Sequence, residues 1–189
     1  MSTNNRETAV STRLRVFGTT RIMILAALFT AMSIVFDKFL AVNIGDSIRI
    51  GLGGLPLQMA GIMLGPVVGA AVGGVSDIIG CLLKGYSINP VITLGAVSVG
   101  FLSGLMYHKV LAGMNKASLP RIALSTLTAH AVGSMLIKSV GMFVYFHTPM
   151  QTLVLRVPIY IVTAAIETAI IAVLMQNKGF MSELERIRR

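Results

Sequence analysis

Residues 48–84 read IRIGLGGLPLQMAGIMLGPVVGAAVGGVSDIIGCLLK, and this stretch is the strongest indication of what kind of protein this is. It is apolar enough to lie in lipid, yet it carries three charged residues, Arg49, Asp77 and Lys84. A charge at membrane depth is costly, so it is usually paired, exposed to water or bound to a ligand. The many glycine and alanine residues let helices pack closely in a bilayer. The stretch therefore predicts a tightly packed membrane protein that holds a binding site.

The composition of the whole chain supports this prediction. Hydrophobic residues make up 54% of the 189 residues and charged residues only 12%, whereas a soluble domain carries about 25% charged residues. Apolar runs of roughly 17–25 residues, the length that spans a bilayer, recur along the chain. Backbone polar groups in lipid must be satisfied within the segment, and the sequence lacks the short alternating pattern of a β-barrel. We expect an all-α integral membrane protein, built as a compact bundle of six transmembrane helices.

Breaks in the apolar pattern divide the chain into three parts. A polar, basic lead covers residues 1–20, the six-helix domain covers 21–176, and a polar tail that could form a short surface helix covers 177–189. The expected spans are 22–40, 48–64, 67–83, a fourth from the loop at 85–90 to about 107, 122–146 and 154–175. The pair Gly65 and Pro66 ends the second span, because these residues interrupt helices. No cleavage site follows the first apolar run, so we interpret the lead as cytoplasmic rather than as a signal peptide.

The net charge of +9 is distributed over the ends of the apolar runs. It does not form a basic face, so nucleic acid is not expected as a partner. Lysine and arginine favour the cytoplasmic side, and eleven of the sixteen basic residues lie in residues 1–21, the connection at 108–121 or the tail. With six spans these three regions fall on one side. We therefore expect a multi-pass protein of the cell membrane with both termini in the cytoplasm.

The remaining basic residues fall near the outer ends of spans, or in the outer half of one: Lys38, Arg49, Lys84, Lys138 and Arg156. Topology does not explain positive charge on that side, whereas an anionic ligand would. Asp37, Asp46 and Asp77 lie on the same side, where they could pair these cations or accept hydrogen bonds from a ligand. For Asp77, an ion pair with Arg49 or Lys138 and a ligand-binding role are both open. Glu167, deeper in the sixth span, is interpreted as structural.

Two further motifs have a structural and a functional interpretation. The loop at 86–90 (YSINP) is either a plain turn, since Asn-Pro is a common turn pair, or a lid that offers Tyr86 and Asn89 to a ligand. Ala27 and Ala31 form a small-xxx-small pattern, which serves packing within the fold or docking of another protein. The glycines at 65, 69 and 73 favour internal packing, because short turns tie the neighbouring spans together.

Signals for an enzyme or a metal site are weak. Residues 80–85 begin like a phosphate-binding loop, but Tyr86 stands in the place of the required lysine and no strand precedes it. The chain is therefore not expected to hydrolyse ATP. The three histidines are not spaced as metal ligands, and the single Cys81 excludes an intramolecular disulfide, so no cofactor or metal is expected. An intramembrane hydrolase that uses Ser103 and His130 is an unsupported alternative.

Several of these motifs together resemble the substrate-binding (S) components of energy-coupling factor (ECF) vitamin transporters, and most of all the folate-specific S component. The resembling residues are 26–31 (AALFTA), 34–36 (IVF), 48–51 (IRIG), 55–56 (LP), 60–61 (AG), 65–66 (GP), Gly69, Gly73, 77–80 (DIIG), Pro90 and 93–94 (TL). They cover most of residues 21–107, whereas the fifth and sixth spans match the family pattern poorly apart from Arg156. The run from Arg49 to Pro56 indicates folate, whereas the Gly-Pro and Asp-x-x-Gly elements are shared across several vitamins.

The resemblance implies a small six-helix protein that binds a vitamin from the outside. It also implies docking of the Ala27 and Ala31 surface on a transmembrane coupling subunit, which two cytoplasmic ATPases drive. The expected ligand-binding residues are Asp37, Arg49, Asp77, Lys84, Tyr86, Asn89, Lys138 and Arg156. If the ligand is folate, Asp77 or Asp37 would bind its pterin. Its glutamate carboxylates would be bound by Arg49, Lys84 or Arg156. Riboflavin or pantothenate is an alternative ligand, and a structural assembly factor without a ligand is a further alternative.

Overall fold

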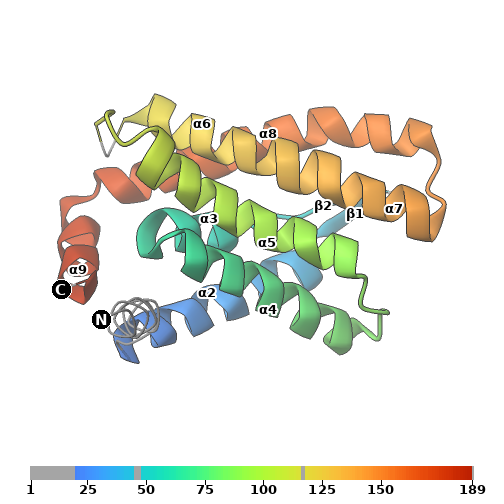
Figure 1. The fold of residues 1–189 in the computed structure, drawn as a ribbon, viewed down its shortest axis with the longest axis horizontal. Helices are drawn as coiled ribbons and strands as arrows, with labels where there is room; N and C mark the ends of the chain where they lie inside the picture. Colours follow the sequence, from blue (N-terminus) through green and yellow to red (C-terminus); the bar gives the residue numbers. More distant parts are fainter. Residues whose placement is uncertain (1–19, 45–47, 116–117, 189) are drawn as a thin grey trace, which may run out of the picture.

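The computed structural model describes residues 20–44, 48–115 and 118–188, and most of these residues are helical (Figure 1). The helices are α2 (Thr20–Lys38), α3 (Gly54–Leu64), α4 (Pro66–Lys84), α5 (Pro90–Leu105), α6 (Leu119–Ala129), α7 (Lys138–Phe146), α8 (Met150–Gln176) and α9 (Lys178–Arg188). Two π-helical segments interrupt the α-helical pattern: η2 (Met106–Val110) continues α5, and η3 (His130–Ile137) joins α6 to α7. A π-helical turn inside a long helix is frequently found at a functional site.

Within the described residues, five helical segments are long and apolar enough to cross a membrane. They are Thr20–Asp37, Pro66–Lys84, Pro90–Val110, Leu119–Phe146 and Met150–Gln176. These segments overlap the expected first, third, fourth, fifth and sixth spans. The prediction of an all-α protein built from membrane-spanning helices is therefore confirmed for these five.

The expected second span over residues 48–64 is wrong in its first part. Ile48–Ile50 forms strand β2, which pairs antiparallel with β1 (Val42–Ile44), and α3 begins only at Gly54. The glycines at 51, 53 and 54 explain the late start, because glycine disfavours the helical conformation. At about 1.5 Å per residue the 11 residues of α3 extend about 16 Å, well short of the roughly 30 Å hydrocarbon core.

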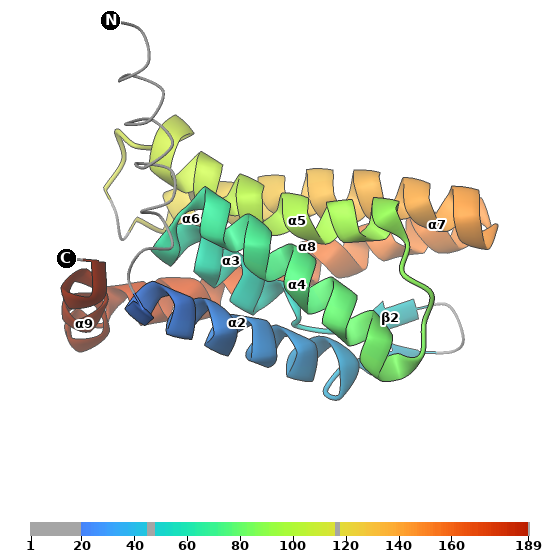
Figure 2. The same cartoon turned by 60° about the horizontal axis from the view of Figure 1, so that its bottom comes forward.

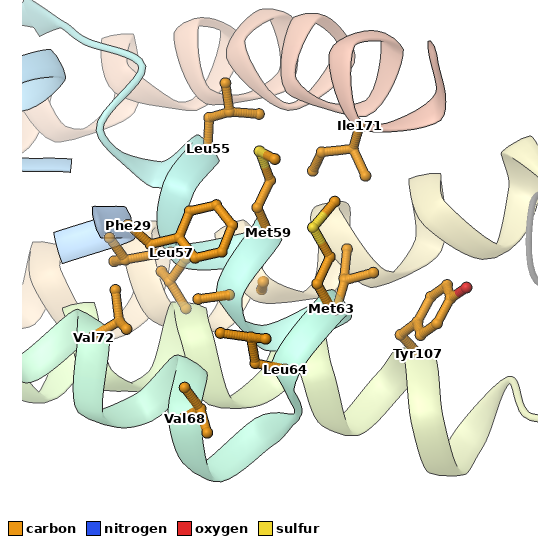
Figure 3. Close-up of a cluster of buried hydrophobic side chains, with 14 of the residues drawn as sticks. Phe29, Leu55, Leu57, Met59, Met63, Leu64, Val68, Val72, Tyr107 and Ile171 are labelled. Atoms are coloured by element: carbon orange, nitrogen blue, oxygen red, sulfur yellow. The ribbon is translucent and has the colours of Figure 1, made fainter. Parts of the chain in front are cut away.

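Helix α3 lies at the centre of the core. Each residue from 55 to 64 is buried, which is typical of a helix that other helices surround on all sides. Figure 3 shows its Leu57 and Met59 close to Phe29 of α2 and Val72 of α4, with Ile171 of α8 beyond. In lipid such packing stabilises the fold by close contact between side chains rather than by removal of water.

The glycines of α4 pack against α5, which confirms their interpretation as internal packing residues. A Cβ atom built on Gly69 would lie 2.5 Å from Gly100 O, and one on Gly73 would lie 2.3 Å from Ala96 O. Backbone atoms cannot move aside as the end of a side chain can, so only glycine permits this approach. Gly65 has a φ of 109°, which favours glycine and lets the chain reverse between α3 and α4.

Helix α9 and the start of α2 lie at the same end of the molecule (Figure 2). The guanidinium of Arg21 lies within 3.5 Å of the carbonyl oxygen of Arg186, and Phe180 and Met181 of α9 pack against the core. The short helix expected in the tail is therefore present, and apolar side chains hold it against the bundle.

Arg121 fixes the connection between η2 and α6, which the sequence indicates only as a linker. It is 5% exposed, and its Nε and Nη2 donate to Tyr107 O at 3.2 and 2.6 Å. Its Nη1 donates to Met114 O at 2.5 Å, and the guanidinium carbon lies 4.1 Å from the centre of the Tyr107 ring. This cation therefore has a structural role in addition to any effect on membrane orientation.

Candidate ligand-binding site

A cavity of about 570 Å³ lies among α2, α3, α4, α5, η3, α7 and α8 and is bordered by the loop at 86–89. Small-molecule sites in proteins typically measure roughly 300–1,000 Å³. Six of the eight binding residues expected from the sequence line this cavity: Asp37, Asp77, Tyr86, Asn89, Lys138 and Arg156. The fold therefore brings together polar residues that lie far apart in the sequence.

Lys84 is placed outside the cavity. It is the last residue of α4 and is exposed, with its Nζ 4.9 Å from the centre of the Phe39 ring. Gly85 follows in the left-handed conformation, with a φ of 67°, and ends the helix. The chain turns at this glycine toward Tyr86, which does line the cavity, and so Lys84 stays on the surface.

The eighth expected binding residue, Arg49, cannot be placed at the cavity, and neither can two further charged residues of the outer side, Lys38 and Asp46. Arg49 lies in β2 opposite Asn43, and its side chain lies outside the described part of the structure. The side chain of Lys38 and the whole of Asp46 also lie outside the described residues. A role for these residues stays a prediction.

Lys138 and Arg156 are the two cations of the cavity wall. Arg156 of α8 is held by Tyr160 one turn later, because its Nη2 donates to the tyrosine hydroxyl at 2.5 Å. Lys138 begins α7, and its stem packs over Gly95, where a Cβ atom would lie 2.5 Å from Lys138 Cγ. Among the described side chains, neither cation has a carboxylate oxygen within 4.0 Å. The ion pair that these side chains do form joins His130 and Glu167. The cavity therefore carries two cations that form no direct ion pair with a described carboxylate.

Two carboxylates also line the cavity. Asp77 of α4 accepts a 2.7 Å hydrogen bond at Oδ2 from Thr93 Oγ1 of α5. This hydroxyl, and not Lys138, is the partner of Asp77 within the described part of the chain. Asp37 lies in the last turn of α2 against Gly53, where a Cβ atom would lie 2.5 Å from Asp37 Cβ. The cavity thus offers hydrogen-bond acceptors as well as cations.

The loop at 86–89 has a structural role at Asn89. The side chain of Asn89 is buried, and its Oδ1 accepts hydrogen bonds from Val91 N at 3.0 Å and Ile92 N at 3.4 Å. Asn89 is therefore the N-cap of α5, in the conformation that asparagine commonly adopts there. Tyr86 is 57% exposed and borders the cavity, so its ring could contact a bound molecule.

A buried polar cluster behind the cavity wall was not assembled from the sequence. His130 lines the cavity. Gln58 of α3 and Glu167 of α8 contact His130, and both are completely buried. His130 Nε2 lies 2.6 Å from Glu167 Oε2, and Gln58 Nε2 donates to the same oxygen at 2.8 Å. The available signal was that an ionisable residue within a membrane span is functional by default. Nothing in the sequence, however, places these three distant residues together.

The surface of α2 that contains Ala27 and Ala31 is exposed, with Ile24 and Leu28 beside them. Short side chains on a lipid-facing helix let another helix approach closely. The surface is therefore accessible to a second membrane protein.

A second cavity of about 600 Å³ lies between the end of α2 and α8. Its lining is almost wholly apolar and includes Phe36, Pro158 and Val162. It contains no charged residue among those described, so the polar cavity is the better candidate for a ligand that carries charges.

The whole length of the bundle matches a known family. Residues 17–178 match the family model described as "ECF-type riboflavin transporter, S component". The chain belongs to this family, and the resemblance to S components is confirmed. It is therefore a membrane-embedded transporter component.

A curated relative is named as a folate transporter. A curated "Folate transporter FolT" from Clostridium novyi (strain NT) is 33% identical over 106 residues, which are 55% of this chain and 58% of that protein. The chain thus matches less than two thirds of the length of this relative.

Solved structures share the fold. A FolT bound with folic acid has a TM-score of 0.69 at 22% identity, over 85% of this chain and 95% of that one. ThiT from Listeria monocytogenes has a TM-score of 0.64 at 18% identity, over 84% and 94%. An S-component for biotin has a TM-score of 0.64 at 17% identity, over 96% and 97%. At these identities the likeness concerns the fold alone.

Proposed function

We propose that this chain binds folate from outside the cell and is the substrate-binding subunit of an ATP-driven importer. One observation carries the proposal. Lys138 and Arg156, without carboxylate partners among the described side chains, share one cavity with Asp37 and Asp77. Folate has two glutamate carboxylates and a flat pterin ring with N–H donors, so it suits both kinds of group. The 33% identity to a relative named as a folate transporter supports this choice.

In this proposal the two ends of the ligand contact different groups. Lys138 and Arg156 bind the carboxylates through charge-assisted hydrogen bonds, which are roughly twice as strong as neutral ones. Asp77 or Asp37 accepts hydrogen bonds from N–H groups, and Tyr86 can stack on the flat ring. Asn89 borders the ligand, and Arg49 adds a further cation.

We propose six spans, with the short α3 as the second of them. The N-terminal lead, the connection at 108–121 and the tail contain most of the basic residues, so both termini are cytoplasmic. Helix α9 and the start of α2 then lie at the cytoplasmic end, and the loop at 86–89 lies at the outer end (Figure 1). The cavity that borders this loop opens to the outside of the cell membrane.

Import requires partners that bind nucleotide, because the chain carries no motif for ATP hydrolysis. We propose that the Ala27 and Ala31 surface of α2 docks on a transmembrane coupling subunit, with two cytoplasmic ATPases attached to that subunit. The exposure of both alanines supports this docking. The bound vitamin would reach the cytoplasm when the subunit topples in the membrane.

A ligand panel tests the proposal. Purified protein in detergent is heated with folate, riboflavin or pantothenate, and the unfolding temperature is measured. A ligand at about 100 times its Kd stabilises the folded state by about 2.7 kcal/mol. We expect folate to raise the unfolding temperature most. If none of the compounds raised it, a vitamin-binding role would be rejected in favour of a structural assembly factor.

Riboflavin is the second candidate, because the description of the matching family model names it. Riboflavin has no carboxylate, so Lys138 and Arg156 would have no counter-ion in its complex. Stabilisation by riboflavin alone would therefore favour this candidate and reject folate.

The hydrolase alternative that uses Ser103 with His130 gains no support from the contacts of these two residues. Ser103 Oγ donates to Gly100 O of its own helix at 3.0 Å, and His130 contacts Glu167 and Gln58. These contacts do not form the nucleophile–base pair that the reaction requires.

A further inference from the structure

The cluster of Gln58, His130 and Glu167 contains more hydrogen-bond acceptors than donors. Glu167 Oε2 already receives donors from His130 Nε2 and Gln58 Nε2, at 2.6 and 2.8 Å. Among the described residues, no donor lies within hydrogen-bonding distance of Glu167 Oε1 or Gln58 Oε1, although both atoms are buried. A buried acceptor that lacks a donor destabilises a protein by about 1–3 kcal/mol. Two such atoms in one cluster therefore call for donors that the described residues do not supply.

Glu167 also sets the tautomer of His130. The tautomer that donates from Nε2 fits the 2.6 Å contact with the carboxylate, and in that tautomer Nδ1 has a lone pair. Gln58 Nε2 lies 2.7 Å from His130 Nε2 because both groups donate to the same carboxylate oxygen. His130 Nδ1 lies 3.2 Å from Ser134 Oγ, and both residues line the cavity. The wall at this point therefore adds a third acceptor, together with a hydroxyl group that can adjust its direction.

Gly54 keeps the cluster next to the cavity. It lies in the cavity wall, and a Cβ atom built on it would lie 2.9 Å from Glu167 Oε1 and 3.2 Å from His130 Cε1. Any larger residue at this position would cover the unpartnered oxygen of Glu167. With glycine there, this oxygen lies directly behind the wall.

We propose that Gln58, His130 and Glu167 form a second binding subsite, which accepts hydrogen bonds from the donor-rich edge of the ring of the ligand. This inference rests on the proposed function and refines it, because it adds the inner cluster to Asp37 and Asp77 as acceptors for the N–H groups of the ligand. The ligand class is a heterocycle with an amino group next to a ring N–H, as in a pterin. The edge of riboflavin has carbonyl oxygens on both sides of its N–H, so these acceptors disfavour it.

The spacing of the two subsites specifies the shape of the ligand. His130 and Lys138 are eight residues apart on one continuous helical stretch, because the π-helical η3 leads directly into α7, so the two subsites lie at different positions along this stretch. A ligand that reaches both subsites must be elongated, with donors at one end and carboxylates at the other. Folate has this arrangement.

The test compares folate with pteroate, which keeps the pterin and lacks the glutamate. Two variants change the inner subsite: Glu167→Gln converts an acceptor into a donor at nearly constant volume, and Gln58→Leu removes the amide. The matched control is Thr168→Val. It removes the 2.6 Å hydrogen bond between Thr126 and Thr168, which is buried between α6 and α8 and does not border the cavity.

Titration calorimetry on the purified proteins gives the Kd values, and size-exclusion chromatography shows that each variant is folded. We expect Glu167→Gln and Gln58→Leu to weaken folate and pteroate by the same factor, at least tenfold, because both compounds contain the ring. Thr168→Val should leave both Kd values within about twofold. If one inner variant does not fold, the other carries the test.

Three results would overturn the subsite. One is folate binding within twofold of wild type in both inner variants. The second is an equal loss in Thr168→Val, which would indicate a general packing effect. The third is a loss for folate without a loss for pteroate. If the wild-type protein bound neither folate nor pteroate, the proposed function would be rejected, and the subsite would be rejected together with it.

Discussion

Thr93 Oγ1 donates a 2.7 Å hydrogen bond to Asp77 Oδ2, and this bond joins α5 to α4 at the wall of the polar cavity. It engages one carboxylate oxygen of Asp77, and the residue can offer the other oxygen to a ligand. The pair therefore separates two effects: Thr93 holds Asp77, whereas Asp77 supplies the negative charge.

Asp77→Asn should weaken folate binding at least tenfold, because the amide has one acceptor oxygen and no charge. Thr93→Val removes only the donor at nearly constant shape. It should lower the unfolding temperature slightly, since hydrogen bonds between membrane helices contribute about 0.6 kcal/mol on average. Its Kd should stay within about threefold of wild type. Calorimetry and thermal unfolding measure both quantities, and the opposite order of effects on Kd would contradict a ligand role for Asp77.

Lys138→Ala and Arg156→Ala should each weaken folate binding at least tenfold, because each removes a counter-ion of a ligand carboxylate. The loss should be larger for folate than for pteroate, which has one carboxylate fewer. Arg156→Lys should recover binding only in part, because lysine lacks the planar fork of the guanidinium. Lys109→Ala is the control, since Lys109 is exposed in η2 and does not line the cavity. Equal losses for both compounds would argue against carboxylate binding.

Gly100→Ala should destabilise the bundle. A Cβ atom at this position would lie 2.0 Å from Gly69 O, so α4 and α5 would have to separate. Overpacking of a close contact typically costs about 1–3 kcal/mol, and a clash with backbone can cost more. Thermal unfolding in detergent measures the change. Gly113→Ala is the control, because nothing lies within 4 Å of a Cβ atom built there, and the same drop in that variant would rule out the contact as the cause.

Replacement of Ala27 and Ala31 by tryptophan should abolish uptake of labelled folate by cells while the purified protein keeps its affinity. Large side chains on this surface would block the close approach of the coupling subunit. Val173→Trp is the control, because Val173 is 69% exposed and lies on α8 rather than on α2. Normal uptake in the double variant would place the docking surface elsewhere.

Arg121→Ala should lower the unfolding temperature without a change in the Kd for folate. The substitution removes hydrogen bonds to Tyr107 O and Met114 O, and bonds to a charged group contribute about 1.5–3 kcal/mol each in favourable cases. Arg121→Lys should be destabilised as well, because lysine cannot donate to both carbonyls in the same geometry. A weaker Kd at unchanged stability would show instead that Arg121 acts on the site.

The sequence predicted the membrane class and most of the spans because these depend on local properties. Runs of apolar residues, breakers such as Gly65–Pro66 and basic loops can be read without knowledge of neighbouring segments. The prediction was wrong over residues 48–53, since the length of an apolar run does not show where a helix begins. Three glycines in that run and pairing with β1 produce a hairpin before the short helix.

The sequence indicates that a polar site exists among the spans, but it does not indicate which of the candidate residues meet there. Charged residues in spans signal function individually, and four of those singled out line one cavity: Asp37, Asp77, Lys138 and Arg156. Lys84 had the same signal as Lys138, yet Gly85 ends α4 and leaves Lys84 on the surface. The depth of Glu167 in the sixth span predicts a structural role, but its contacts with His130 and Gln58 depend on how three helices pack and are not visible in the sequence.

The sequence by itself determined that this chain is a helical membrane protein with costly charges, since hydropathy, breakers and charge distribution are properties of single segments. Only the tertiary structure decided which charges meet. Helices α4 and α5 approach each other closely at their glycines. The packing of α3, η3 and α8 brings residues 58, 130 and 167 within hydrogen-bonding distance. The physical reason is that helix packing in lipid depends on complementary shapes of segments that are distant in the sequence. The sequence of one segment does not show which other segment will pack against it.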